Sequence, residues 1–112
     1  MRFVFFAAPG FVTNIKIRVT SSRSVQITWS PAENKGSGVI GHDILYNRAD
    51  KPVIERLWKV HSIRDGNLLN VTIGNLLPNV PYEFKIYILT KETRGVPSEV
   101  VKAKTLEDGM FI

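Results

Sequence analysis

The sequence contains no cysteine, so neither a disulfide framework nor a zinc site with cysteine ligands is available to it. Histidine is scarce too, because His42 and His61 are the only two. The acidic residues are scattered along the chain, and two histidines without clustered carboxylates are a poor ligand set for a metal ion. We therefore expect no metal and no other cofactor.

Long apolar runs are also missing. No apolar stretch approaches the roughly 20 residues needed to cross a bilayer, so no membrane span is predicted. Residues 1–8 begin with a positive charge, but their apolar run is shorter than the about 7 to 15 residues typical of a signal peptide. We interpret residues 1–8 as a linker or added tail and residues 107–112 as a C-terminal linker. The roles of these apolar ends stay open.

The charge of the chain is basic but lacks any block of one sign. Fifteen lysines and arginines against ten acidic residues give +5 over 112 residues, a length that fits one domain. Such a balance favours contact with acidic surfaces such as sulfated glycans. Because the basic residues are spread from Arg2 to Lys104, a solvated positive surface is the simpler explanation, and nucleic-acid binding is not expected.

What the chain does contain is alternation of apolar and polar residues with a period of two, broken by turn residues. No window of ten or more residues shows clean helical spacing. Seven short strands are predicted, with turn signals about every 8 to 12 residues, including one around Trp58 and Val60 and one with Ile40, His42 and Ile44 on one face. This pattern predicts an all-β fold: a seven-stranded antiparallel sandwich of two sheets.

Three stretches carry a resemblance to a known family. The first stretch has a strand tryptophan followed by a proline-bearing turn and an aromatic strand, in VQITWSPAENKGSGVIGHDILY. The second places Leu76 and Pro78 before Tyr82, in LLPNVPYEFKIYI. The third resembles a closing strand and reads GVPSEVVKAKT. Residues 9–106 resemble a fibronectin type III domain, which has an immunoglobulin-like sandwich. The sequence departs from that family at His42, where tyrosine is usual, and at Thr93, which replaces a common loop glycine.

The resemblance implies structural roles for Trp29, Leu76, Pro78 and Tyr82. In sandwiches of this architecture, a tyrosine at the corner before the sixth strand bonds through its hydroxyl to the backbone a few residues upstream. We expect the Tyr82 hydroxyl to reach a backbone acceptor there. Pro78 restricts φ at the corner, and Leu76 is expected to anchor the corner in the core.

No catalytic constellation is predicted. His42 and Asp43 are adjacent on a strand, so their side chains face opposite ways and cannot form a base and its orienting carboxylate. The stretch GSGVIG matches a dinucleotide-binding pattern, but the residues after it alternate like a strand, and no helix N-terminus is predicted to hold a phosphate. The chain is therefore not expected to be an enzyme.

A candidate partner face lies on the outer side of the second sheet. Alternation turns three apolar side chains and four polar ones away from the core, namely Leu45, Asn47, Lys85, Tyr87, Leu89, Lys102 and Lys104. Exposed tyrosine and leucine clusters often mark interaction sites. The alternatives are scattered surface residues or a face covered by the apolar tails.

Two further surface features are candidate sites. Lys16, Arg18 and Arg23 could contact a heparin-like anionic glycan, and the tripeptide NVT makes Asn70 a candidate for N-glycosylation. The resemblance implies a non-catalytic spacer and interaction or adhesion module of a larger cell-surface or matrix protein, with protein partners and neighbouring domains. A glycan-binding module and an intracellular structural module remain alternatives, and the parent protein, its partner and its oligomeric state stay open.

Overall fold

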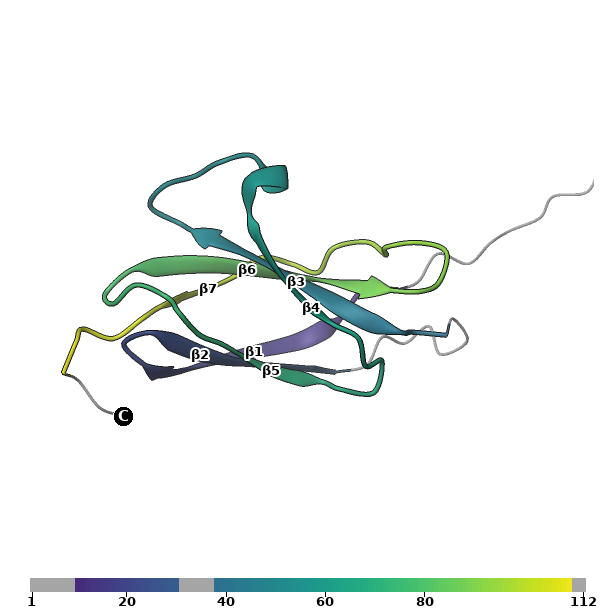
Figure 1. The fold of residues 1–112 in the computed structure, drawn as a ribbon, viewed down its shortest axis with the longest axis horizontal. Coiled ribbons are helices and arrows are strands. Elements are labelled where there is room, and N and C mark those ends of the chain that lie inside the picture. Colours follow the sequence, from purple (N-terminus) through teal and green to yellow (C-terminus); the bar gives the residue numbers. More distant parts are fainter. Residues whose placement is uncertain (1–9, 31–37, 110–112) are drawn as a thin grey trace, which may run out of the picture.

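The computed structural model describes residues 10–30 and 38–109. These residues form two packed antiparallel sheets (Figure 1). The strands are β1 (Thr13–Ser21), β2 (Ser24–Ser30), β3 (Gly41–Arg48), β4 (Lys59–Ile63), β5 (Asn70–Ile73), β6 (Pro81–Leu89) and β7 (Val101–Lys104). One sheet has the order β1-β2-β5 and the other β4-β3-β6-β7. The predicted all-β, seven-stranded sandwich is confirmed.

The core lies between the two sheets and follows the alternation of the strands. On β2, Val25, Ile27 and Trp29 are buried, while the residues between them are only partly covered. From the opposite sheet, Ile44 and Phe84 are fully enclosed and belong to the same cluster. This arrangement follows from the period of two, because every second side chain of a strand points to the same face.

The sequence placed two parts of the second sheet incorrectly. Trp58 was expected inside a strand, but β4 begins at Lys59, and a short 3₁₀ turn, η1 (Glu55–Leu57), lies before Trp58. Ile40 was expected to face inward, but it precedes β3 and is exposed. β3 begins at Gly41, where a Cβ atom would collide with the carbonyl oxygen of Ile63, so the close approach of β4 requires glycine there.

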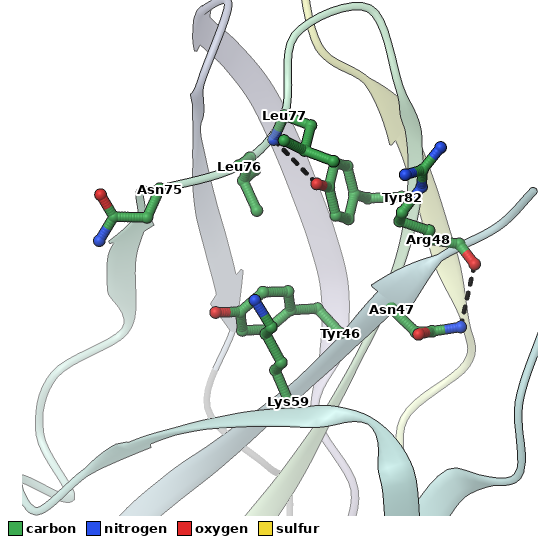
Figure 2. Close-up of a pocket in the computed structure, with 8 residues that line it drawn as sticks. All are labelled: Tyr46, Asn47, Arg48, Lys59, Asn75, Leu76, Leu77 and Tyr82. Atoms are coloured by element: carbon green, nitrogen blue, oxygen red, sulfur yellow. Dashed lines mark hydrogen bonds between the residues drawn. The ribbon is translucent and has the colours of Figure 1, made fainter. Parts of the chain in front are cut away.

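The corner before β6 is fixed by Tyr82. Its hydroxyl accepts a hydrogen bond of 2.9 Å from the backbone N–H of Leu77 (Figure 2), and Leu76 is buried in the core as expected. The predicted direction of this bond was wrong, because the hydroxyl meets a backbone donor and not an acceptor. Asn75 and Asn79 take left-handed φ angles of 57° and 56°, a conformation that asparagine tolerates better than most residues.

Two hydroxyl side chains bind the closing segment to the sandwich. Ser98 exchanges backbone hydrogen bonds with Ile86, whose N–H donates to the Ser98 hydroxyl at 2.8 Å and whose carbonyl accepts from the Ser98 N–H at 2.9 Å. Near the corner, the Thr105 hydroxyl donates to the Leu77 carbonyl at 2.6 Å and accepts from the Val80 N–H at 3.0 Å. These buried bonds satisfy backbone groups that the sheet ladder leaves unpaired.

Candidate interaction surface

The outer face of the four-stranded sheet is oriented as alternation predicts but is not exposed. Leu45, Tyr87 and Leu89 lie outside the core cluster, yet each is less than 10% exposed. The prediction of an open apolar patch at these three residues is therefore wrong. Tyr87 is covered in part by a segment whose residues 54–58 sequence reasoning interpreted as part of a strand.

That segment, residues 51–58, connects β3 to β4 and is called the strap below. Figure 1 shows it beside the four-stranded sheet, on the side away from the three-stranded sheet. Its fold is local: the Leu57 N–H donates to the Ile54 carbonyl and the Trp58 N–H to the Glu55 carbonyl, each at 2.9 Å. The Trp58 indole N–H donates to the Val53 carbonyl at 3.1 Å.

Glu55 anchors the strap to the sheet. Its carboxylate pairs with the Lys85 ammonium at 2.8 Å and accepts a hydrogen bond of 2.5 Å from the Tyr87 hydroxyl. The Lys85 ammonium also lies 4.7 Å from the centre of the Trp58 ring. The bonds from Lys85 and Tyr87 lower the pKa of Glu55, and burial together with the Glu55 carboxylate raises the pKa of Tyr87 to about 12.

A second charged group continues this layer. Arg94 donates to Asp43 at 2.5 Å, and its guanidinium lies 4.5 Å from the centre of the Tyr87 ring. Ser62 also donates to Asp43 at 2.5 Å. Burial raises the pKa of Asp43, but the bonds from Ser62 and Arg94 and the charge of Arg94 outweigh it, so the pKa lies below its usual range. This carboxylate is buried because both partners keep it charged and bonded.

The strap presents its own apolar side chains to solvent. Val53, Ile54 and Leu57 are 44%, 57% and 63% exposed, and we call these three the strap patch. Lys51 and Arg56 are exposed beside them, with no carboxylate partner among the described residues. The only carboxylate of the strap is that of Glu55, which binds the sheet. The solvent-facing charge of the strap is therefore basic.

Sequence reasoning missed the strap although its alternation is broken. Val53 and Ile54 are adjacent apolar residues that follow Pro52. Leu57 and Trp58 are a second adjacent apolar pair, which follows Arg56. Adjacent apolar residues cannot both point inward on a strand with one buried face. That break, together with Pro52, was the available signal that residues 51–58 are not a strand.

The polar members of the predicted partner face differ in their exposure and contacts. Lys85 is largely covered by the strap, and the Asn47 amide donates to the backbone carbonyls of Arg48 and Lys51 at 2.9 and 3.2 Å. Lys102 and Lys104 are exposed on β7 at the edge of the sheet. Lys85 is the register partner of Leu45 and shares the Glu55 carboxylate with Tyr87, so these residues do lie on one face, but that face is covered at its centre.

The three cationic candidates are exposed, but they differ in their contacts. Lys16 and Arg18 share one face of β1, and Arg18 donates to the Gln26 side chain at 2.8 Å. Arg23 lies in the turn after β1 and pairs with Asp108 at 3.2 Å. Both side chains of that pair are more than half exposed, so it contributes little stability.

The remaining residues singled out in the sequence lie on an edge strand, at the corner, in the core and in the turn after β6. Asn70 is exposed at the start of β5, which is an edge strand, and Pro78 is partly buried at the corner. Trp29 is buried against His42, with ring centres 5.1 Å apart. Thr93 turns the chain after β6 by exchanging backbone hydrogen bonds with Thr90. The predicted tail of residues 1–8, the stretch from 31 to 37 and residues 110–112 lie outside the described residues.

No enzyme-like cluster forms in the described part of the chain. His42 packs in the core beside Trp29, while Asp43 binds Ser62 and Arg94 on the opposite face of β3. Residues 10–30 and 38–109 contain no group of three or more potential metal-ligating side chains. Within the same residues, no helix is long and apolar enough to cross a membrane.

Comparison with known proteins decides the family. The family model described as "Fibronectin type III domain" matches residues 7–104. This chain is a fibronectin type III domain. The fold of the domain is also that of the fn3 domain of human contactin 1, with a TM-score of 0.79 at 20% identity, over 96% of this chain and 90% of that one.

Among curated proteins, the domain is similar to parts of much longer chains. It is 32% identical over 90 residues to Roundabout homolog 1 of Mus musculus, covering 80% of this chain and 6% of that protein. It is 29% identical over 91 residues to receptor-type tyrosine-protein phosphatase F of Homo sapiens, covering 81% of this chain and 5% of that protein. The domain thus spans about one twentieth of the length of these relatives.

Proposed function

We propose that this fibronectin type III domain is a non-catalytic module of a larger cell-surface or matrix protein, where it spaces neighbouring domains and contacts a protein partner. The observation that carries the proposal is the family match together with much longer relatives, of which the matched part is only 5–6% and one of which is named a receptor-type protein. Fold alone does not assign a function, so the contact must be argued from a surface.

The strap patch is the surface that best fits such a contact. Val53, Ile54 and Leu57 are more exposed than is usual for three apolar side chains so close in sequence, and clustered apolar exposure marks interaction sites. The basic residues Lys51 and Arg56 lie beside them. Charge complementarity then favours a protein partner that surrounds an apolar centre with acidic side chains.

Binding of the domain to cultured cells tests this function. The domain is presented as a fluorescent tetramer, and bound fluorescence is compared between the native sequence, the double variant Ile54→Ser/Leu57→Ser and the control Val100→Ser, whose side chain is exposed on another segment. We expect saturable binding that the double variant loses and the control retains. Equal binding by all three proteins would show that the strap patch is not the contact.

A heparin competition separates the glycan alternative. If Lys16, Arg18 and Arg23 hold a sulfated glycan, soluble heparin and added salt abolish cell binding, and Lys16→Gln/Arg18→Gln removes it. Binding to a protein through the strap patch survives both treatments. The first pattern would replace the proposed partner class with an anionic glycan.

The extracellular context has its own test. When the domain is secreted from a eukaryotic cell behind a supplied signal sequence, its intact mass should exceed the polypeptide mass by a glycan that Asn70→Gln removes, because Asn70 is exposed. If the domain is secreted without any added mass, Asn70 no longer supports an extracellular location. The intracellular structural module then becomes an equally good explanation.

A further inference from the structure

A cavity of about 280 Å³ opens between the end of β3, the start of β4 and the segment that joins β5 to β6 (Figure 2). This volume is near the lower limit of ligand pockets and suits a molecule with a single ring. The lining is half apolar and half polar: Tyr46, Asn47, Arg48, Lys59, Asn75, Leu76, Leu77 and Tyr82. No part of the proposed function uses this cavity.

The apolar wall of the cavity is held in place by the fold. Leu76 is buried, and the Tyr82 ring is fixed because its hydroxyl bonds the Leu77 N–H at 2.9 Å. The Tyr46 ring stacks on Phe84 with ring centres 6.0 Å apart. Two aromatic rings and a leucine therefore form a wall that exists before any ligand arrives, which limits the entropy lost on binding.

The polar lining divides into groups that are already bonded and groups that are not. Arg48 donates twice to Asp50, at 3.0 and 2.8 Å, and the Asn47 amide bonds two backbone carbonyls. Of the groups that face the cavity, the Lys59 ammonium and the Tyr46 hydroxyl have no partner of this kind in the part of the chain that the structure describes. The Asn75 amide points away from the cavity in Figure 2. Figure 2 shows the Lys59 side chain rising beside the Tyr46 ring, below Leu76.

Both unbonded groups act as donors at neutral pH. An ammonium has three N–H donors and no acceptor. Burial raises the pKa of Tyr46, so its hydroxyl keeps its proton and can donate it. Two donors, one of them charged, select a ligand that presents an anionic acceptor, and the wall selects an apolar body beside that acceptor.

We propose that this cavity binds an aromatic carboxylate, with its ring against Leu76 and Tyr82 and its carboxylate on the Lys59 ammonium and the Tyr46 hydroxyl. Two kinds of ligand carry an aromatic ring beside a carboxylate: a small free acid, and a peptide whose C-terminal residue is aromatic. The site is separate from the strap patch, so Ile54→Ser/Leu57→Ser should leave binding here unchanged.

A titration of the 112-residue chain with 3-phenylpropanoate, followed by ¹H–¹⁵N correlation spectra, tests the proposal. We expect saturable shifts at the amides of Lys59, Leu76 and Leu77, with a dissociation constant of about a millimolar, as befits a ligand of this size. Lys59→Gln should weaken binding at least about fivefold and Tyr46→Phe about threefold. Lys102→Gln, which removes an exposed lysine outside the cavity, is the matched control and should change nothing.

The uncharged analogue 3-phenyl-1-propanol tests the anion requirement and should bind at least about fivefold more weakly than the acid. Shifts that rise without saturation, that reach half their maximum at the same ligand concentration in Lys59→Gln, or that the alcohol reproduces in full would overturn the proposal. Peptides ending in phenylalanine, with a free or an amidated terminus, identify the source. Tighter binding of the free-terminus peptide than of 3-phenylpropanoate supports a chain terminus, and binding of the small acid alone supports a free acid.

Discussion

At the scale of single residues, Tyr82 shows how much one polar atom contributes to this fold. The resemblance to fibronectin type III domains placed it at a corner, and the structure places its hydroxyl on the Leu77 N–H at 2.9 Å. The identity of the bonded atom was beyond the sequence, because it depends on how the chain between residues 75 and 81 turns.

Tyr82→Phe should lower the free energy of unfolding by about 1 kcal/mol or more, since the Leu77 N–H loses its acceptor while the ring stays in place. Urea unfolding followed by tryptophan fluorescence measures the change. Tyr46→Phe is the control, because its hydroxyl bonds no described residue. If the two variants lose the same stability, the corner bond has no special role.

His42 is the second residue whose environment has a measurable consequence. It is 3% exposed, packs edge-on against Trp29, and faces Ile63 and Ile88 across the neighbouring strands. Burial lowers its pKa below the ordinary value of 6.5. The sequence identified the position as a departure from the family but could not decide whether it would be wet, smaller or sensitive to pH.

Stability should fall as the pH drops below 6.5, because the unfolded chain then binds a proton that the folded His42 resists. The loss is at most about 1.4 kcal/mol per pH unit and ends once the pH falls below the lowered pKa of the folded state. Denaturation at pH 7.5 and 5.5 measures it. His42→Phe should flatten the dependence and His61→Gln, at an exposed position, should not. A slope that survives in His42→Phe would assign the effect to other groups.

At the scale of elements, strands and strap differ in how far the sequence determines them. The core and the six strands other than β4 were predictable, because burial of one face of a strand imposes a local alternation of apolar and polar residues. The strap was not, because its position depends on pairing between Glu55 and two residues of β6 that are about thirty positions away. For the same reason, the sequence predicted that Leu45, Tyr87 and Leu89 are exposed, whereas they are buried in the structure.

Glu55→Gln should loosen the strap without unfolding the domain. It removes the ion pair with Lys85 and weakens the bond from Tyr87, but Glu55 is partly exposed, so the global loss should be below about 1 kcal/mol. Hydrogen exchange at the amides of Leu57 and Trp58, which donate inside the strap, should speed up several-fold. Glu99→Gln, at an exposed carboxylate elsewhere, should leave both amides unchanged.

Unchanged exchange in Glu55→Gln would mean that the strap is held by Trp58 and its backbone turn alone. The layer of Arg94 and Asp43 beside Tyr87 would then be a separate unit and not part of one charged network.

At the scale of the whole molecule, the sequence predicts two layers, but the structure adds a third, the strap, against the larger sheet. Two sheets enclose the core, and the strap lies against the outer face of the larger sheet at Lys85 and Tyr87. This moves the candidate contact surface from the strand residues Leu45, Tyr87 and Leu89 to the strap patch. The strap, and not the outer face of the sheet, is therefore the apolar surface that solvent and a partner can reach.

Thiol labelling measures this claim directly, because a chain without cysteine gives a single reporter in each variant. Leu57→Cys and Leu45→Cys are each treated with a thiol-reactive dye under native conditions, with circular dichroism to show that both are folded. We expect Leu57→Cys to react nearly as fast as an unfolded peptide and Leu45→Cys to react roughly a hundredfold more slowly, because Leu57 is exposed and Leu45 is buried. Equal, fast labelling of both folded variants would contradict it and return the contact surface to the sheet.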